Sequence, residues 1–478
     1  MKFVLLWTDL ALWLMVAAVV VYALRIRAQA NLRTTWRRVL RDPIAASAGV
    51  VMALFLGVTL VDSVHLRPAL ATTDGGTVYD TRALSTLDLL LARQIAMREV
   101  SYSVPLGTHG FNKESFVDAQ GQAGRDYPRL KFGGSHLGDP AVQWAGDVAR
   151  RATLGLVGGL AIAALLVALT AAALARHHHG WRHALADLAA DRTVYPLRAV
   201  LIMLTVILLL AGPVIALMPQ YHVFGTDRTG NDILVQALKS VRTAFVIGAL
   251  STLATLPLAL LLGVLAGYYK GWVDEVIQYL YTTLSAVPNV LLIAACVLMV
   301  QVYFDKNPEL FETAAERSDL KMLMLCLILG LTGWAGLCRL VRAETLKLRE
   351  LDYVQAATAF GVGDLAIMGR HILPNVMHLV LITVVLSFSE LILYEAVLTY
   401  VGVGVDPTTS SFGSMINLAR AEMSRDPIVW WSFAAAFGFM VGLVLAANLF
   451  ADGVRDAFDP KARSARPRIF VRRGAADA

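Results

Sequence analysis

Residues 353–375 read YVQAATAFGVGDLAIMGRHILPN and lie between two long apolar segments. The first half has a short helical pattern that contains the small residues Ala356 and Ala357 and ends at Gly361. Glycine readily adopts the left-handed conformation that ends many helices. The pattern therefore predicts a short helix that stops at Gly361.

The second half of the same stretch predicts another short helix. Gly363 and Asp364 are typical of a turn in which the aspartate caps the following helix. Leu373 and Pro374 are expected to end that helix, because proline disfavours helical continuation. The whole stretch is thus a predicted helix-turn-helix hairpin, longer than a plain connection between two apolar segments requires.

The composition places the chain in a membrane. Of its 478 residues 57% are hydrophobic and only 16% are charged, and a soluble chain of this length carries more charge. The net charge of +6 does not indicate nucleic-acid binding, because the basic residues gather in loops beside apolar runs. Three cysteines lie in apolar runs without metal-ligand or disulfide spacing, at Cys296, Cys326 and Cys338.

Nine apolar runs are long enough to cross a bilayer as helices. They lie at about residues 3–24, 44–61, 154–174, 197–217, 243–268, a run that ends near 302, 320–337, 376–400 and 428–451. The sixth run contains Pro288, which predicts a kink or break.

Arginines follow the first run directly and place its end in the cytoplasm, with the amino terminus outside and the carboxyl terminus inside. A cleaved signal peptide is the alternative, with a cleavage site at residues 28–30. The arginines beside the run favour an uncleaved anchor.

The runs divide the chain into five parts. Residues 1–61 hold two spans, and residues 62–151 form a polar, glycine-rich insert. In the insert, Leu84, Leu87, Leu91 and Ile95 predict one amphipathic helix. We expect the insert to be a small extracytoplasmic subdomain.

Residues 152–196 contain the third span and a loop with the run His177-His178-His179. Imidazoles can bind zinc or nickel. Consecutive histidines lack the geometry of a built metal site, so a solvated cytoplasmic loop is the favoured interpretation. No metal site is therefore assigned.

A glycine-rich motif follows the fourth span. Gly225 and Gly230 allow tight turns, and Asp227 and Asp232 can cap backbone amides. With Thr226 they predict a rigid periplasmic scaffold. A catalytic role for the aspartates is not indicated, because no base or metal ligand accompanies them.

Two glutamates lie in the eighth span. Glu390 and Glu395 are five residues apart and therefore point to different helix faces. An acid in a span is costly unless it faces a cavity or a partner. Glu395 either accepts hydrogen bonds from the turn at Gly402 to Gly404 and holds a gate, which we favour, or faces the pathway and attracts a cationic group.

The motifs together resemble a known family. Gln355-Ala356-Ala357, Gly361 and Leu373-Pro374 have the spacing of the cytoplasmic coupling loop of ABC-importer permeases, here residues 344–375. Gln355 stands where that family usually has glutamate, and His371 where it usually has isoleucine. The ending HILPN and the motifs at 36–43, 225–232 and 402–415 resemble the dipeptide, oligopeptide and nickel permeases.

The resemblance implies an all-α integral membrane protein with a six-helix-type permease core at residues 197–460 and a cytoplasmic tail at 461–478. It implies ATPase coupling through the hairpin and a location in the bacterial inner membrane. The implied partners are a second permease in a heterodimer, two ATPase subunits or domains, an extracytoplasmic solute-binding protein and the lipid bilayer. No nucleic-acid partner is implied.

The resemblance also implies import of peptides or a related small solute by alternating access. The sequence has no phosphate-binding GxxxxGK[ST] loop. The chain is therefore expected to be a transport subunit that binds no cofactor itself, with ATP and magnesium in the partner ATPases.

Two other function classes compete with this interpretation. A secondary transporter driven by an ion gradient would require inverted repeats and broken helices at the midplane, and we find no inverted repeat. An intramembrane enzyme would require clustered catalytic polar residues within the spans. The sequence leaves open whether the solute is a dipeptide, a longer peptide, a nickel chelate or a peptide antibiotic.

Overall fold

The computed structural model describes residues 2–70, 78–80, 82–117, 123–176, 180–311 and 313–458. Within these ranges nine helices are long and apolar enough to cross a membrane, which confirms the predicted number and the all-α membrane class. They are α1 (Trp7–Ala28), α3 (Pro43–Asp62), α6 (Pro140–Ala175), α8 (Leu197–Leu217), α9 (Ile233–Tyr269), α11 (Asn289–Lys306), α12 (Ala314–Arg349), α15 (Leu373–Tyr400, extended back to Asp364) and α17 (Trp431–Phe458).

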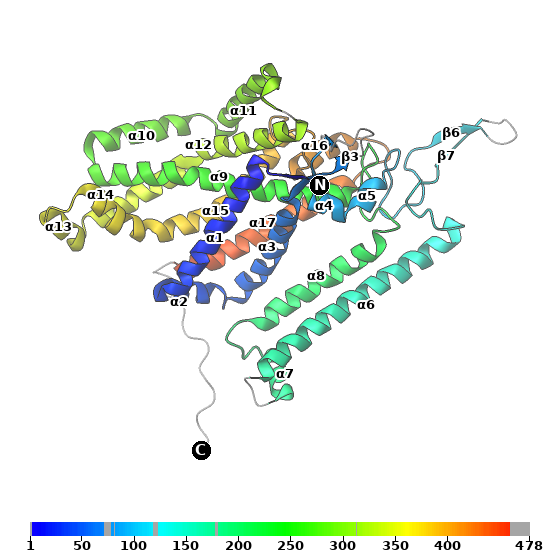
Figure 1. Ribbon diagram of the computed structural model, residues 1–478, viewed down its shortest axis with the longest axis horizontal. Coiled ribbons are helices and arrows are strands. Elements are labelled where there is room, and N and C mark those ends of the chain that lie inside the picture. The colour runs from blue at the N-terminus through cyan, green and yellow to red at the C-terminus, as the bar shows by residue number, and fades with distance from the viewer. Residues whose placement is uncertain are drawn as a thin grey trace.

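The centre of the bundle is the long pair α9 and α12, which pack along each other (Figure 1). Helices α3, α15 and α17 pack around this pair. Cys326 and Cys338 are buried in α12, in agreement with a packing role. Burial inside the bundle is greatest for α9 and α12, so these two helices form its core.

Helices α6 and α8 form a second packed pair beside the bundle (Figure 1). Their backbones approach so closely that a Cβ added at Gly155 would lie 2.4 Å from the carbonyl oxygen of Gly212. Close backbone approach at small residues is the usual way in which helices associate in lipid. The short helix α7 (Trp181–Ala189) lies between them in the chain, and α8 contacts the bundle through α3.

Two helix ends were predicted from prolines, and the structure confirms one of them. The sixth span is broken into α10 (Gly271–Ala286) and α11 around Pro288, as predicted. The expected helix end at Leu373-Pro374 is wrong. Helix α14 (Asp364–Ile367) continues through a π-helical turn at Met368–Ile372 into α15, whose first turn contains Pro374. Proline is tolerated there because an N–H in the first turn needs no helical partner.

The two ends of the bundle differ in structure. The hairpin end carries α13 (Asp352–Ala359) and α14, and the insert end carries the short strands (Figure 1). The strands are β1 (Lys2–Val4), β2 (His65–Arg67), β3 (Ala69–Leu70), β4 (Val78–Tyr79), β5 (Leu84–Ser85), β6 (Glu114–Val117) and β7 (Ala123–Asp126). Because β1 pairs with β2, the amino-terminal strand lies on the same side as the insert.

The three small sheets are all antiparallel. One has the order β1-β2-β5, and the others are the pairs β3-β4 and β6-β7. The remaining helices are α2 (Ala30–Val39), α4 (Thr86–Leu90), α5 (Ala92–Ala96), a 3-10 turn at Pro308–Leu310 and α16 (Phe412–Glu422).

The insert differs from its prediction in two respects. The single amphipathic helix is wrong: Leu84 pairs with Leu66 in the sheet, and two short helices, α4 and α5, meet at Leu91. Helix α6 begins at Pro140, so the predicted boundary at 151 falls inside a helix. Gly75, Gly76 and Gly121 of the insert, the histidine run 177–179 and the tail 461–478 lie outside the described residues.

Candidate functional site

The hairpin is held to the bundle by its own apolar side chains. Val354, Ile367 and Ile372 are buried in one cluster with residues of α9, α10 and α12. The small residues on α13 and the turn at Gly361 agree with the sequence pattern. The hairpin is therefore a rigid projection of the bundle rather than a loose loop.

Asp364 was expected to cap α14, but it does not. The N-cap is Gly363, and no side-chain cap bond is formed. The carboxylate of Asp364 instead accepts a hydrogen bond of 2.9 Å from the hydroxyl of Tyr268, at the end of α9. Arg349 donates to the carbonyl oxygen of Tyr268 at 2.6 Å. Asp364 thus fixes the hairpin to α9, because a long-range partner competes with the local cap.

The small residues predicted to couple to a partner lie on or near the surface. Gln355 and Ala356 are exposed, and Ala357 is half-buried against the hairpin cluster. Gln355 donates to the carbonyl oxygen of Glu350 at 3.2 Å. Gly361 has a φ of +76°, so the predicted left-handed helix end is confirmed. Their role in coupling stays a prediction.

The apolar tip of the hairpin was not predicted from the sequence. Phe360 is 88% exposed and Leu365 is 80% exposed, one on each side of the turn at Gly361. A large apolar side chain so exposed outside the bilayer commonly marks a protein contact. The sequence signal for this tip is the pair of large apolar residues on either side of the glycine turn.

At the insert end, a buried cluster joins the insert to the motif after α8. We call it the clasp: Glu99, Ser103, His222, Thr226 and Asp232. The carboxylate of Glu99 accepts three backbone hydrogen bonds of 2.8–2.9 Å from residues 131–133. His222 lies 3.5 Å from Glu99 and 2.8 Å from Asp232, on opposite ring nitrogens.

Charge holds the clasp together. Burial would raise the pKa of Glu99, but hydrogen bonds from His222 and the backbone outweigh it and lower that pKa to about 2. Burial would lower the pKa of His222, but Asp232 and Glu99 outweigh it and raise that pKa to about 9. Glu99 and His222 are therefore both charged near neutral pH.

The glycines of the motif allow the insert backbone to approach. Gly225 and Gly230 have φ values of +73° and +77°, which confirms the predicted turns. A Cβ at Gly230 would lie 1.9 Å from the carbonyl oxygen of Glu99, and one at Gly225 would lie 2.5 Å from that of Ser103. The sequence predicted the turns, but not what they accommodate.

The polar residues of the motif form the expected caps. Asp232 caps α9 by accepting from the N–H of Leu234 at 2.8 Å. Asp227 accepts from the N–H groups of Thr229 and Asn231. The hydroxyl of Thr226 donates to the carbonyl oxygen of Ser101 at 2.9 Å. The motif is therefore both a local turn and the core side of the clasp.

Glu395 is fully buried, whereas Glu390 is exposed. The hydroxyl of Thr399 donates to Glu395 at 2.8 Å and accepts from the N–H of Val405 at 3.2 Å. The expected direct bonds from the turn at Gly402 to Gly404 are therefore replaced by a relay through Thr399. A Cβ at Gly404 would lie 1.9 Å from that hydroxyl, so this glycine permits the contact.

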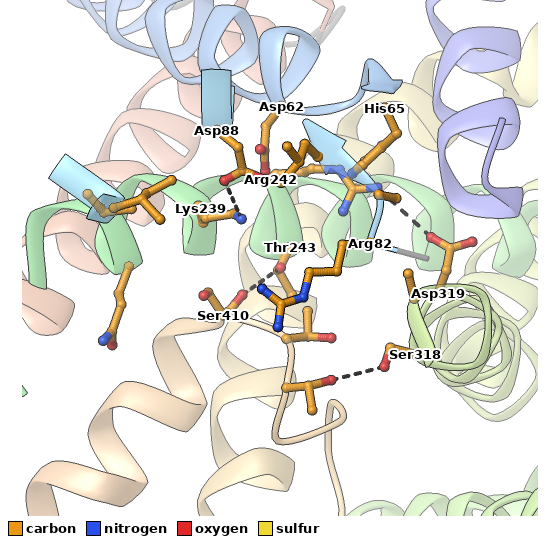
Figure 2. A pocket seen from close by; sticks show the side chains of 18 of the residues that line it. Asp62, His65, Arg82, Asp88, Lys239, Arg242, Thr243, Ser318, Asp319 and Ser410 are labelled. Carbon is orange, nitrogen blue, oxygen red and sulfur yellow. Dashed lines mark hydrogen bonds and ion pairs between the residues drawn. The ribbon is translucent and has the colours of Figure 1, made fainter. Parts of the chain in front are cut away.

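A polar cavity of about 920 Å³ lies at the insert end (Figure 2). Its walls come from the insert, α9, α12 and residues 408–410. Figure 2 shows Lys239 paired with Asp88 on one wall, at 2.6 Å, and Asp319 on another. Neither the cavity nor its charges were predicted from the sequence.

A buried guanidinium lies at the inner wall of this cavity. Arg242 of α9 donates to Asp9 at 2.5 Å and to the hydroxyl of Thr8, both on α1. Asp319 of α12 lies 3.9 Å from Arg242, and His65 bonds Asp9 at 2.7 Å. This network fixes α1 to the bundle core. Charges within long apolar helices were its sequence signal.

The comparison with known families agrees with this arrangement. Residues 259–464 match the family described as the binding-protein-dependent transport system inner membrane component. The match includes the hairpin, α15 and α17.

Individual relatives extend the match further. The oligopeptide transport system permease protein OppC of Mycobacterium tuberculosis is 31% identical over 245 residues, which are 51% of this chain and 78% of that protein. OppC of Haemophilus influenzae is 30% identical over 246 residues, 52% of this chain and 72% of that protein. The glutathione transport system permease protein GsiD of Pectobacterium atrosepticum is 32% identical over 243 residues, which are 51% of this chain and 74% of that protein.

Proposed function

The chain belongs to the binding-protein-dependent inner membrane permeases of ABC importers, and from this premise we propose that it carries peptides into a bacterial cell. Two similar permeases are named for oligopeptides and one for glutathione, which is itself a short peptide. Peptides are the substrate class that these names share. Membership of this family argues against the ion-gradient carrier.

The hairpin is the proposed contact with an ATPase. The observation that carries this proposal is its construction: a buried face fixed to α9 and α12, and a tip that exposes Phe360 and Leu365. A rigid projection transmits force because its buried side cannot slide independently of the helices. Movement of a bound ATPase would therefore move α9 and α12, and alternate the side to which the pathway opens.

The orientation follows from this role. The hairpin end would face the cytoplasm, where ATP is available, and the insert end would face outward. The pairing of β1 with β2 then puts the amino terminus outside with the insert. We further propose a second permease as heterodimeric partner, two ATPase subunits or domains that hold ATP and magnesium, and a solute-binding protein at the insert end.

Double substitution of the hairpin tip tests the ATPase contact. Phe360→Ser with Leu365→Ser should leave folding unchanged, because exposed positions contribute within about 0.5 kcal/mol of stability. It should remove ATPase subunits from the purified complex and abolish trialanine uptake in cells. Ala359→Ser, at an exposed position on the same helix, is the matched control.

The two readouts separate the parts of the proposal. ATPase retained by the double variant, with uptake at the wild-type level, would show that the tip is not the contact. Uptake of other solutes but no peptide by the wild-type system would show that the substrate class is wrong.

A further inference from the structure

The cavity at the insert end is built for a polar solute. Its volume of about 920 Å³ is within the range of small-molecule sites. Insert residues close it on one side, and α9, α12 and residues 408–410 close it on the other. Four segments that are far apart in the sequence thus meet around one space, which no single segment would create.

Two insert side chains offer unused hydrogen-bonding groups to this space. Among the described residues, the guanidinium of Arg82 has no hydrogen-bond or ion-pair partner, and Figure 2 shows it extending into the cavity. Gln94 also lines the cavity; the residue is 7% exposed overall, and no hydrogen-bond partner of its side-chain amide lies within the described residues. An amide that faces a polar cavity offers both a donor and an acceptor to a ligand.

The inner wall has the opposite charge. Asp62 and Asp319 both line the cavity and are buried, and Asp319 shares the guanidinium of Arg242 with Asp9. Asp62 also accepts from the hydroxyl of Ser85 at 2.5 Å. Asp319 accepts from the N–H and the hydroxyl of Thr8. Among the described residues, Ser85 is the hydrogen-bond donor to Asp62, so the other oxygen of Asp62 can accept from a cationic group.

We propose that this cavity binds a short peptide as a zwitterion on its way to the pathway. Arg82 binds the terminal carboxylate, since a guanidinium matches a carboxylate in charge and geometry. Gln94 pairs with a peptide group, because its amide offers both a donor and an acceptor. Asp62 and Asp319 receive the terminal ammonium. The inference rests on the proposed peptide transport and assigns a binding site for it on this chain.

Titration of the full complex with trialanine tests the assignment. We expect the wild-type complex, without its binding protein, to bind trialanine in calorimetry, and Arg82→Gln to weaken that binding by about tenfold. Arg93→Gln is the control, because Arg93 is exposed on α5 but does not line the cavity. Gln94→Leu should weaken binding by about fivefold.

Blocked peptides identify which end each group holds. Trialanine amide, which lacks the carboxylate, should bind wild type and Arg82→Gln equally weakly. N-acetyl-trialanine should remain sensitive to Arg82→Gln, because it keeps the carboxylate.

Two results would overturn the assignment of the cavity as a peptide site and leave the proposed function intact. One is equal trialanine affinity in Arg82→Gln and Arg93→Gln. The other is a wild-type complex that imports trialanine but does not bind it. A wild-type system that neither binds nor imports trialanine overturns both.

Discussion

The hairpin end and the insert end are both fixed to α9, but they are assembled in different ways. The hairpin is a single stretch, residues 353–375, whose buried side chains reach the neighbouring helices directly. The clasp is assembled from Glu99, Ser103, His222, Thr226 and Asp232, which lie more than a hundred residues apart at its extremes. The proposed ATPase surface is thus built from one local stretch, whereas the insert is attached by charged groups brought together from distant parts of the chain.

Charge is also distributed differently. The pair Lys270 and Glu350 near the hairpin lies at the surface, and such pairs add little stability. His222 and its two carboxylates are almost completely shielded from solvent. Substitutions in the clasp should therefore affect folding, and substitutions at the hairpin surface should affect function.

Removal of the Glu99 carboxylate is expected to have the largest effect. Glu99→Ala would leave His222 and three backbone N–H groups without their shared acceptor. Loss of one partner from a buried charged pair costs about 3–5 kcal/mol. The insert should become sensitive to protease in membranes, while Glu114→Ala, on the surface strand β6, should not change it. Wild-type resistance in Glu99→Ala would mean that the insert is held elsewhere.

The clasp should also depend on pH. The pKa of His222 is raised from 6.5 to about 9, so its contribution, about 3 kcal/mol, is complete below pH 6.5 and lost as pH rises through about 9. The pKa of Glu99 is lowered from 4.5 to about 2, so its contribution is complete above pH 4.5 and lost as pH falls through about 2.

Protease resistance of the insert, measured from pH 4 to pH 10, should therefore be greatest between about pH 4.5 and 6.5. In His222→Gln the protease resistance of the insert should no longer fall at high pH. The protease resistance of the hairpin should be the same as in the wild type. The same alkaline loss in His222→Gln would assign it to another group.

The smallest expected effect is that of Gly361→Ala, and Gly230→Ala is its counterpart at the insert end. Gly230 and Gly361 have nearly the same φ, +77° and +76°, but only Gly230 has a neighbour within reach of an added Cβ. Gly361→Ala should cost about 1 kcal/mol from the backbone alone. Gly230→Ala adds the clash with Glu99 and should cost about 2–3 kcal/mol more. Equal losses of thermal stability would show that backbone conformation alone matters at both ends.

Much of the fold could be predicted from the sequence because its signals are local. Apolar length predicts the nine spans, Pro288 predicts the break between α10 and α11, and Gly361 predicts the helix end. Each of these depends on a few neighbouring residues. Asp364 and Pro374 show the limit: Asp364 bonds Tyr268 of α9 instead of capping its own helix, and Pro374 lies in the first turn of α15 instead of ending a helix.

The sequence by itself determined the membrane class, the number of spans, the hairpin and the turns at Gly225 and Gly230. Only the tertiary structure decided that those turns face Glu99 and Ser103, that Asp364 bonds Tyr268, and that the insert and core enclose a cavity. The physical reason is range. Backbone conformation and hydrophobic length are set by adjacent residues, whereas a buried charge is stable only beside a partner that the fold brings from a distant part of the chain.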